Sequence, residues 1–491
     1  MNLALAFCEI AQRHPAKTAL FWGSSEFSYG GLWDKSLAVA EQLRAAFGVR
    51  AGDRVGIWLK NCPEFVPALF GILQTGAAAV PINNFLKPPE VDFILADAGI
   101  EVVILDEAAR EAFSSLNRPN LKVLCVETLF ADSVAPPDCA ACAASESELA
   151  VIIYTSGTTG HPKGAMLSHG NLLANTRSCQ RVLEVVGDDR FAVLLPMFHS
   201  FMLTVGILLP LLSGGSIVLI KTLHPPKNVV AEILQHRATL LPAVPQFFRA
   251  LTHGSVPVNL PLRLCISGGA PLPAEILKEF TARFPIPLLE GYGLSEASPV
   301  VSFNPIHGPW KAGSIGIPIY EVDVSVQNDN GDLLPAGVTG EICVRGENVM
   351  MGYWKQPTET AKVMRNDWLL TGDIGHVDTD GYFYITDRKK DMLLVNGINV
   401  YPREIEEVLY AFPGVKEAAV IGFPDPRKGE QPIAYVSAHD GTELQEEPLL
   451  HFARERLADY KVPRHIVILP ALPRNATGKI LKTELRKRPS S

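Results

Sequence analysis

The chain contains 491 residues, of which 47% are hydrophobic and 20% charged, and its formal net charge is −8 at pH 7. A chain of this length and composition buries several domain-sized cores, which excludes a largely disordered protein. Its acidic balance provides no basic field for nucleic acid, so we expect no nucleic-acid partner.

Eight cysteines are spread along the chain, which is typical of a reduced, cytoplasmic protein. Cys139 and Cys142 form the one Cys-x-x-Cys pair, but no second ligand pair stands nearby, so we expect no zinc site there. Glu9 interrupts the short apolar stretch at the N-terminus, which argues against a signal peptide. Residues 191–220 carry no Asp, Glu, Lys or Arg. Their prolines and glycines favour short buried elements over a membrane-spanning helix, and a peripheral membrane contact stays open.

Helical and strand patterns alternate along the first half of the chain. Helices are predicted over residues 32–47, 63–75 and 228–236. Strands are predicted over residues 54–59, 78–81, 102–105, 122–126, 216–220 and 262–266. Such alternation indicates parallel sheets covered by helices, here in two blocks separated by a low-complexity linker over residues 136–147.

From about Val322 the pattern changes to short alternating strands. Asn330-Gly331 and Asp380-Gly381 are turn pairs, and the second closes a hairpin onto an apolar run. We therefore expect a small antiparallel β-subdomain. An α+β tail follows Lys390, with one helix opened by Pro402 and another predicted over residues 449–460.

The densest local signal is the segment from Tyr154 to Gly164, which holds three glycines, four Ser or Thr residues and a lysine. It follows the apolar run 149–153, so a buried strand ends in a Gly/Ser/Thr loop. Glycines admit an anion close to the backbone, while hydroxyls and Lys163 add donors and charge. The spacing differs from a Walker loop, because Gly164 follows the lysine. The loop predicts phosphate binding by another architecture, although most such loops bind nothing.

Five further motifs follow in order: Gly268–Pro273, Glu290–Glu296, Thr371–Asp373, Asp387–Asp391 and Asn475–Ile480. Together with the glycine loop, they resemble the adenylate-forming superfamily of acyl-CoA synthetases, luciferases and peptide-synthetase adenylation domains. The resemblance runs from about Asn2 to Lys487. It implies a large N-terminal region (1–389) of two α/β subdomains and a β-barrel, followed by a small, mobile α+β C-terminal domain (390–491).

The resemblance also implies ATP, Mg²⁺ and coenzyme A, and it assigns roles to the motif residues. The phosphate-binding residues are Thr155, Ser156, Gly157, Thr158, Thr159, Gly160 and Lys163. The residues around adenine are Tyr292 against the ring, Gly269 and Ala270 opposite, and Glu290, Gly291 and Gly293 beside it. Asp373 matches the ribose-binding aspartate, and Arg388 matches the arginine that reaches ribose and phosphate.

Three residues are expected to be catalytic by resemblance. Glu296 would hold the magnesium ion together with Thr155, and Lys479 would contact both the substrate carboxylate and the α-phosphate. Taken alone, Glu296 is an exposed acid at a helix start and Lys479 a solvated lysine. Thr371–Asp373 alone is a tight turn, and residues 388–390 are a solvated charge run. The glycines beside Tyr292 suggest an exposed ring, with a core residue as the alternative.

The acyl pocket is expected at His199, Ser200, Phe201 and Gly268. The apolar residues after this segment, and its lack of a basic residue, favour a medium- or long-chain fatty acid over a polar substrate, with an aryl acid as the alternative. His199 either gates the acyl path or is a buried, satisfied histidine.

By resemblance, the C-terminal domain turns at the hinge residue Lys390, and Gly397 lies beside a pantetheine tunnel. The expected activity is an AMP-forming ligase that joins a small-molecule carboxylic acid to CoA. A carrier-protein phosphopantetheine is the alternative acceptor, a non-catalytic nucleotide-binding protein is the third reading, and a homodimer stays open.

Overall fold

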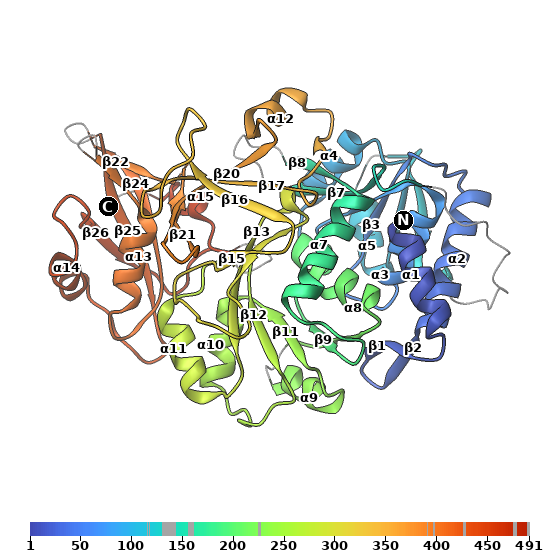
Figure 1. The fold of residues 1–491 in the computed structure, drawn as a ribbon, viewed down its shortest axis with the longest axis horizontal. Coiled ribbons are helices and arrows are strands. Elements are labelled where there is room, and N and C mark those ends of the chain that lie inside the picture. The colour runs from blue at the N-terminus through green and yellow to red at the C-terminus, as the bar shows by residue number, and fades with distance from the viewer. Residues whose placement is uncertain are drawn as a thin grey trace.

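The computed structural model describes residues 1–114, 116, 118–129, 144–155, 162–223, 227–389, 391–395, 398–425, 429–474 and 479–488. Within them the strands form four sheets, with helices packed around and between the sheets (Figure 1). The structure thereby confirms the expected multi-subdomain α/β architecture with an α+β C-terminal part.

The first sheet is mostly parallel. Its described strands lie in the order β18 (Gly352–Tyr353), β8 (Lys163–Ser168), β7 (Leu149–Thr155), β4 (Ala78–Pro81), β3 (Arg54–Trp58), β5 (Val102–Leu105) and β6 (Lys122–Cys125). The five strands from β7 to β6 run parallel, whereas β8 and β18 are antiparallel additions at one edge. The apolar runs of the first block thus form strands close to where the pattern predicts them.

The second sheet is also built around parallel strands. Its described strands are β15 (Ile317–Pro318), β14 (Val300–Phe303), β13 (Leu288–Gly293), β12 (Leu264–Ser267), β11 (Leu240–Ala243), β9 (Arg190–Val193), β10 (Ser216–Leu219), β1 (Thr18–Trp22) and β2 (Ser25–Ser28), in this spatial order. The hairpin β1–β2 belongs to the N-terminal block of the sequence but completes this sheet through parallel pairing of β1 with β10.

The β-subdomain predicted after Val322 is an antiparallel sheet. Its described strands are β16 (Val322–Gln327), β17 (Gly340–Gly346), β20 (Trp368–Val377) and β19 (Met364–Arg365), with β21 (Phe383–Arg388) paired to β20. The C-terminal part has its own sheet, which contains β23 (Ile398–Val400), β22 (Leu393–Val395), β25 (Gly429–Ala438), β24 (Val415–Asp425) and β26 (His465–Ile468). A separate core around Ile405 and Val420 supports this sheet.

The helices cover the sheets. They are α1 (Leu3–Arg13), α2 (Tyr29–Ala45), α3 (Phe65–Thr75), α4 (Pro88–Ala98), α5 (Glu107–Ser114), α6 (Val126–Leu129), α7 (His169–Val182), α8 (Leu209–Leu212), α9 (Lys227–Gln235), α10 (Pro245–His253), α11 (Ala274–Arg283), α12 (Pro357–Val363), α13 (Pro402–Tyr410), α14 (Glu446–Arg454) and α15 (Lys482–Leu485). A π-helix η1 (Met202–Leu208) and a 3₁₀-helix η2 (Ser295–Ala297) complete the described elements.

Local chemistry sets many of the helix ends. Ser28 and Ser168 accept hydrogen bonds from the first turns of α2 and α7, as N-cap residues do. Pro402 begins α13, where the missing N–H has no partner to lose. The predicted helix over 449–460 is shorter than expected, because α14 ends at Arg454 although Leu457 still packs into the same core.

The uncharged run 191–220 contains most of β9 together with η1, α8 and β10, and nearly all of these residues are buried. This agrees with the prediction of short buried elements. Among the described residues, the structure contains no helix with the length and apolar character needed to cross a bilayer.

A buried carboxylate holds the amino ends of three strands in the second sheet. Asp189, before β9, is 2% exposed, and its two oxygens accept hydrogen bonds of 2.8 and 2.7 Å from the Arg263 guanidinium, before β12. Thr239, before β11, donates to the same carboxylate at 2.8 Å. These contacts lower the pKa of Asp189 against the opposing effect of burial. The cluster therefore fixes the edge of the sheet from which the strands run toward the site.

Replacement of Asp189 by alanine leaves a guanidinium without its buried partner. We expect Asp189→Ala to lower the free energy of unfolding by about 3–5 kcal/mol, the usual effect of breaking a buried ion pair. Asp323, on β16, is the exposed partner of Arg345. Asp323→Ala should change the free energy of unfolding by less than about 1 kcal/mol. Urea unfolding of the two variants compares them, and equal effects would contradict the assigned role of Asp189.

Candidate functional site

The site lies where parallel strands of the two large sheets reach their carboxyl ends. Thr155 ends β7, Gly268 follows β12, and Glu290 lies in the neighbouring strand β13, level with Ser267. His199 lies on the connection that leaves β9. Ligands of open α/β sheets bind at such edges. The fold thus gathers motifs that are more than one hundred residues apart.

The glycine loop joins two paired strands. Thr155 pairs with Lys163 across the β7–β8 hairpin, and the Thr155 hydroxyl donates to the Lys163 carbonyl at 3.4 Å. The loop residues predicted to bind phosphate, Ser156, Gly157, Thr158, Thr159 and Gly160, lie outside the described residues. Their role therefore stays a prediction.

Lys163 and Glu296 meet at Tyr353. The Lys163 ammonium forms an ion pair with Glu359 of α12 and lies 5.2 Å from the centroid of the Tyr353 ring. The Tyr353 hydroxyl donates to Glu296 at 2.8 Å. Pairing of β18 with β8 brings Tyr353 to this position. Glu296 is therefore a partly buried, hydrogen-bonded carboxylate rather than the exposed acid of the alternative interpretation.

The sequence interpretation missed Tyr353 and Glu359. The only local signal is the Gly352-Tyr353-Trp354 triplet, which has no chemistry of its own, so pairing of distant strands decides its place. Lys163 must exchange Glu359 for phosphate if it binds ATP. The Glu296 carboxylate and the Thr155 hydroxyl are hard oxygen donors, the kind that Mg²⁺ prefers.

Tyr292, Asp373 and Arg388 form one cluster. Asp373, 2% exposed in the middle of β20, accepts a hydrogen bond of 2.5 Å from the Tyr292 hydroxyl and forms an ion pair with Arg388, with 2.9 Å between its Oδ1 and Nε. Burial and the Asp373 charge hold the pKa of Tyr292 well above its usual range, so the phenol keeps its proton. Arg388 and Lys389, two residues of the charge run, are paired with acidic side chains, and Thr371–Asp373 lies within β20 rather than in an isolated tight turn.

The glycines on either side of Tyr292 allow close packing of β13 against the chain of β14. A Cβ on Gly291 would lie 2.2 Å from the Phe303 ring, and a Cβ on Gly293 would lie 2.2 Å from the Pro299 carbonyl oxygen. Tyr292 is half-buried and packs against core residues, so it lies between the exposed ring expected from these glycines and the core alternative. Close pairing of β13 with β14 is the reason for both glycines.

Glu290 supports the loop that contains Gly269 and Ala270. Its carboxylate accepts a hydrogen bond of 3.0 Å from the backbone N–H of Leu272, just beyond that loop. Gly269 has φ +77°, a left-handed conformation that favours glycine. Glu290 is 5% exposed, and burial raises its pKa to about 7, although the charge of Arg403 opposes the shift.

The predicted acyl segment faces the same region. The Ser200 and Ser295 hydroxyls are 2.9 Å apart, so Ser200 lies next to the turn that carries Glu296. The Phe201 ring packs against Gly268, where a Cβ would lie 3.0 Å from Cζ. His199 Nδ1 accepts a hydrogen bond of 3.3 Å from the backbone N–H of Phe201.

Lys479 reaches this region from the C-terminal part. Burial, and then the Lys479 charge, lower the pKa of His199 to about 4, so the imidazole is neutral at neutral pH. The structure thus brings Lys479 into the electrostatic neighbourhood of His199, from 280 residues further along the chain.

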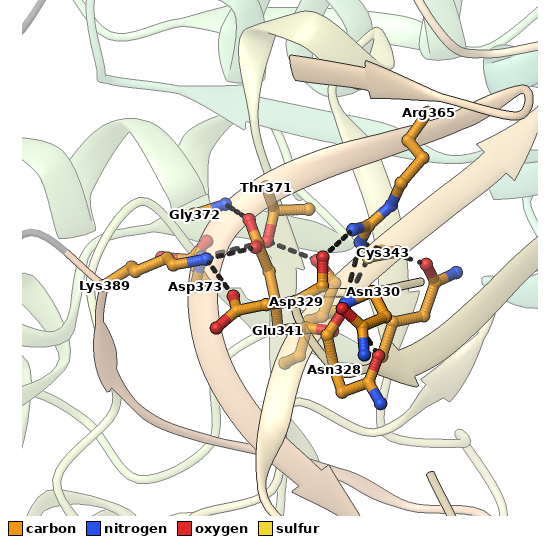
Figure 2. A network of polar contacts seen from close by, with 12 residues as sticks. Asn328, Asp329, Asn330, Glu341, Cys343, Arg365, Thr371, Gly372, Asp373 and Lys389 are labelled. Carbon is orange, nitrogen blue, oxygen red and sulfur yellow. Dashed lines mark hydrogen bonds and ion pairs between the residues drawn. The ribbon is translucent and has the colours of Figure 1, made fainter. Parts of the chain in front are cut away.

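Lys390, the predicted hinge residue, and Gly397, predicted to lie beside the pantetheine tunnel, are outside the described residues, so both roles stay predictions. The chain before position 390 is held by the network in Figure 2. Lys389 donates to Asp329 at 2.8 Å and to Glu341 at 3.1 Å, and Glu341 also accepts from the backbone N–H of Gly372 at 3.0 Å. One buried carboxylate therefore connects the end of β21 to the backbone beside Asp373.

The raised pKa of Glu290 predicts a pH-dependent stability. The folded state holds a proton on Glu290 up to about pH 7, whereas the unfolded state loses it near 4.5. The stability of the wild type should therefore fall relative to Glu290→Gln as pH rises from 4.5 to 7, by up to about 3 kcal/mol. Unfolding free energies at several pH values measure this difference. Glu347→Gln, at an exposed position, is the control, and a flat difference for Glu290→Gln would refute the shift.

The chain matches two family models. The model for AMP-binding enzymes matches residues 7–354, and the model for the AMP-binding enzyme C-terminal domain matches residues 404–479. Two curated relatives cover nearly the whole chain. A feruloyl-CoA synthase of an Amycolatopsis species is 40% identical in an alignment of 486 positions that covers 97% of each chain. A long-chain-fatty-acid–CoA ligase of Bacillus subtilis (strain 168) is 35% identical in an alignment of 518 positions that covers 97% of this chain and 92% of the relative.

Two solved structures of one relative, with and without ATP, superpose on this chain to different extents. ATP-bound MatB from Rhodopseudomonas palustris superposes with a TM-score of 0.92 at 32% identity, over 99% of both chains. Apo MatB, at the same identity and coverage, superposes with a TM-score of 0.79. The arrangement described above is therefore closer to the ATP-bound form. With both family models matched and ATP and CoA as co-substrates, the chain belongs to the AMP-binding enzyme family, as an adenylate-forming CoA ligase.

Proposed function

We propose that the protein joins an aromatic, feruloyl-type carboxylic acid to CoA through an acyl-AMP intermediate. The packing of Phe201 on Gly268 carries this proposal, because no alkyl chain passes between ring and backbone while the ring stays in place. A planar aromatic acid gains from packing against such a ring. The 40% identity to a feruloyl-CoA synthase supports the same substrate class.

A medium- or long-chain fatty acid, the substrate expected from the sequence, is the second candidate. The uncharged run 191–220 and the 35% identity to a long-chain-fatty-acid–CoA ligase favour it. We propose that this substrate requires Phe201 to rotate away from Gly268, so the effect of Phe201→Ala separates the two candidates.

In the first step, a carboxylate oxygen of the acid attacks the α-phosphorus of ATP, and pyrophosphate leaves with the electrons of the broken P–O bond. Two anions approach each other, so cations that are in place beforehand lower the barrier. Lys479 supplies this charge beside His199, whose neutral imidazole does not repel it. Asp373 accepts from the ribose hydroxyls, and Arg388 reaches the ribose and phosphate. Mg²⁺, held by Glu296 and Thr155, would screen the phosphates.

In the second step, the CoA thiolate attacks the carbonyl carbon of the acyl-AMP, and AMP leaves with the electrons of the C–O bond. We propose that the part beyond Lys390 turns between the steps and that Gly397 lies beside the thiol path. A carrier-protein phosphopantetheine is the alternative acceptor.

The hydroxyl of Tyr292 aligns Asp373, so its loss should weaken ATP binding. We expect Tyr292→Phe, which keeps the ring, to raise KM for ATP about 10-fold, or about 1.4 kcal/mol for one hydrogen bond to a charged group. Tyr382→Phe is the matched control, since its hydroxyl donates to the Pro309 carbonyl at 2.6 Å elsewhere in the β-subdomain. An unchanged KM for ATP in Tyr292→Phe would exclude this role.

Pyrophosphate release with ATP, Mg²⁺ and a panel of acids tests the substrate. The panel contains acetate, medium- and long-chain fatty acids, benzoate and ferulate, each with and without CoA. We expect the highest kcat/KM with ferulate and an increase with CoA. Phe201→Ala should lower kcat/KM for ferulate about 10-fold and raise it for long chains, because the lost ring opens the path along Gly268.

Two controls accompany the panel. Acetate is too short to extend far from the carboxylate site, so its rate should not respond to Phe201→Ala. Lys479→Ala should lower the release rate about 10²–10³-fold for every acid. A wild type that prefers long chains supports the fatty-acid candidate instead. Pyrophosphate release without any CoA thioester points to a carrier protein.

A further inference from the structure

Arg249, in the large N-terminal region, contacts the C-terminal part. It lies on α10, which packs on the second sheet beside α11. Its guanidinium donates to the carbonyl oxygen of Lys416 and, at 3.4 Å, to that of Val415, at the start of β24. It also contacts His439 Nε2, one residue after β25 ends. Figure 1 places α10 and α11 next to the C-terminal part.

The environment of Arg249 suits a contact that forms and breaks. Burial lowers the pKa of the guanidinium, and its Nε atom is buried without a hydrogen-bond partner. Burial and the Arg249 charge also lower the pKa of His439, so the neutral imidazole accepts from Arg249. The nearby carboxylates Glu279 and Glu417 partly offset the burial of the charge. Water replaces these partners if the C-terminal part moves away, so the contact costs little to open.

The contact belongs to the arrangement that serves the first step. It coexists with the Lys479 charge beside His199, and both depend on the same placement of the C-terminal part. That placement is closer to ATP-bound MatB than to apo MatB, with TM-scores of 0.92 and 0.79. Arg249 precedes the nearest motif residue, Gly268, by 19 residues, and the described contacts place it against backbone carbonyls and His439.

We propose that Arg249 is a positioning residue that seats the C-terminal part for adenylation, so that Lys479 reaches the substrate carboxylate. The two carbonyls and His439 form a receptor for the guanidinium that is present only in this arrangement. Loss of the contact therefore slows the first step and leaves the second step, which uses another arrangement, intact. This inference rests on the proposed two-step ligase reaction, but it does not depend on which carboxylic acid is the substrate.

The test separates the two half-reactions in the full-length protein. Acid-dependent exchange of labelled pyrophosphate into ATP reports the first step, and formation of the CoA thioester from synthetic acyl-AMP reports the second. The acid is the one that gives the wild type its fastest pyrophosphate release. We expect Arg249→Met to slow the exchange at least 10-fold, while the rate of thioester formation stays within twofold of the wild type or rises.

Two further variants make the result specific. Arg249→Lys keeps a charge and one carbonyl contact, so it should restore part of the exchange rate. Arg345→Met removes an exposed guanidinium paired with Asp323 and should change neither step. Equal losses in both half-reactions, with a lower unfolding midpoint, would show a merely structural role and overturn the proposal. An unchanged exchange rate in Arg249→Met would overturn it as well, whatever acid the panel identifies.

Discussion

The buried carboxylate of Asp373 is the constraint on which the site depends. A charge that is 2% exposed is unfavourable unless it is paired, and Asp373 takes its partners from two directions. Tyr292 reaches it from the second sheet, and Arg388 reaches it from the last strand before the C-terminal part. One carboxylate thus connects the second sheet, the β-subdomain and the strand that leads to the C-terminal part.

The cations of the site come from separate parts of the protein, and the described contacts give several of them an internal partner. Lys163 of the first sheet pairs with Glu359, Arg388 of the β-subdomain pairs with Asp373, and Lys479 arrives with the C-terminal part. Concentrated positive charge would be unfavourable before ATP arrives, and these acidic partners reduce the cost. In the proposed reaction, the phosphates of ATP would take the place of such carboxylates. The arrangement explains how one protein keeps enough charge for a reaction between two anions without destabilising the fold.

Apolar periodicity predicted much of the fold because it reflects burial, which each strand or helix satisfies locally. The strands predicted at 54–59, 78–81 and 102–105 appear within a residue of their expected ends. Apolar periodicity does not predict how distant segments pair. The hairpin β1–β2 joins the second sheet rather than its neighbours in sequence, and Thr371–Asp373, locally a turn pair, continues through β20 because β17 and β21 pair on either side.

The sequence by itself determined the family, the order of the motifs and the types of side chain that the chemistry needs, because these depend on residue identity and spacing alone. The tertiary structure decided which side chains meet. Tyr353 joins Lys163 to Glu296 only because β18 pairs with β8, and Arg249 meets Val415 and Lys416 because the C-terminal part packs against α10. A tyrosine after a glycine and an arginine on a surface helix carry no local sign of such roles, since contacts over more than 150 residues follow from packing and charge in three dimensions.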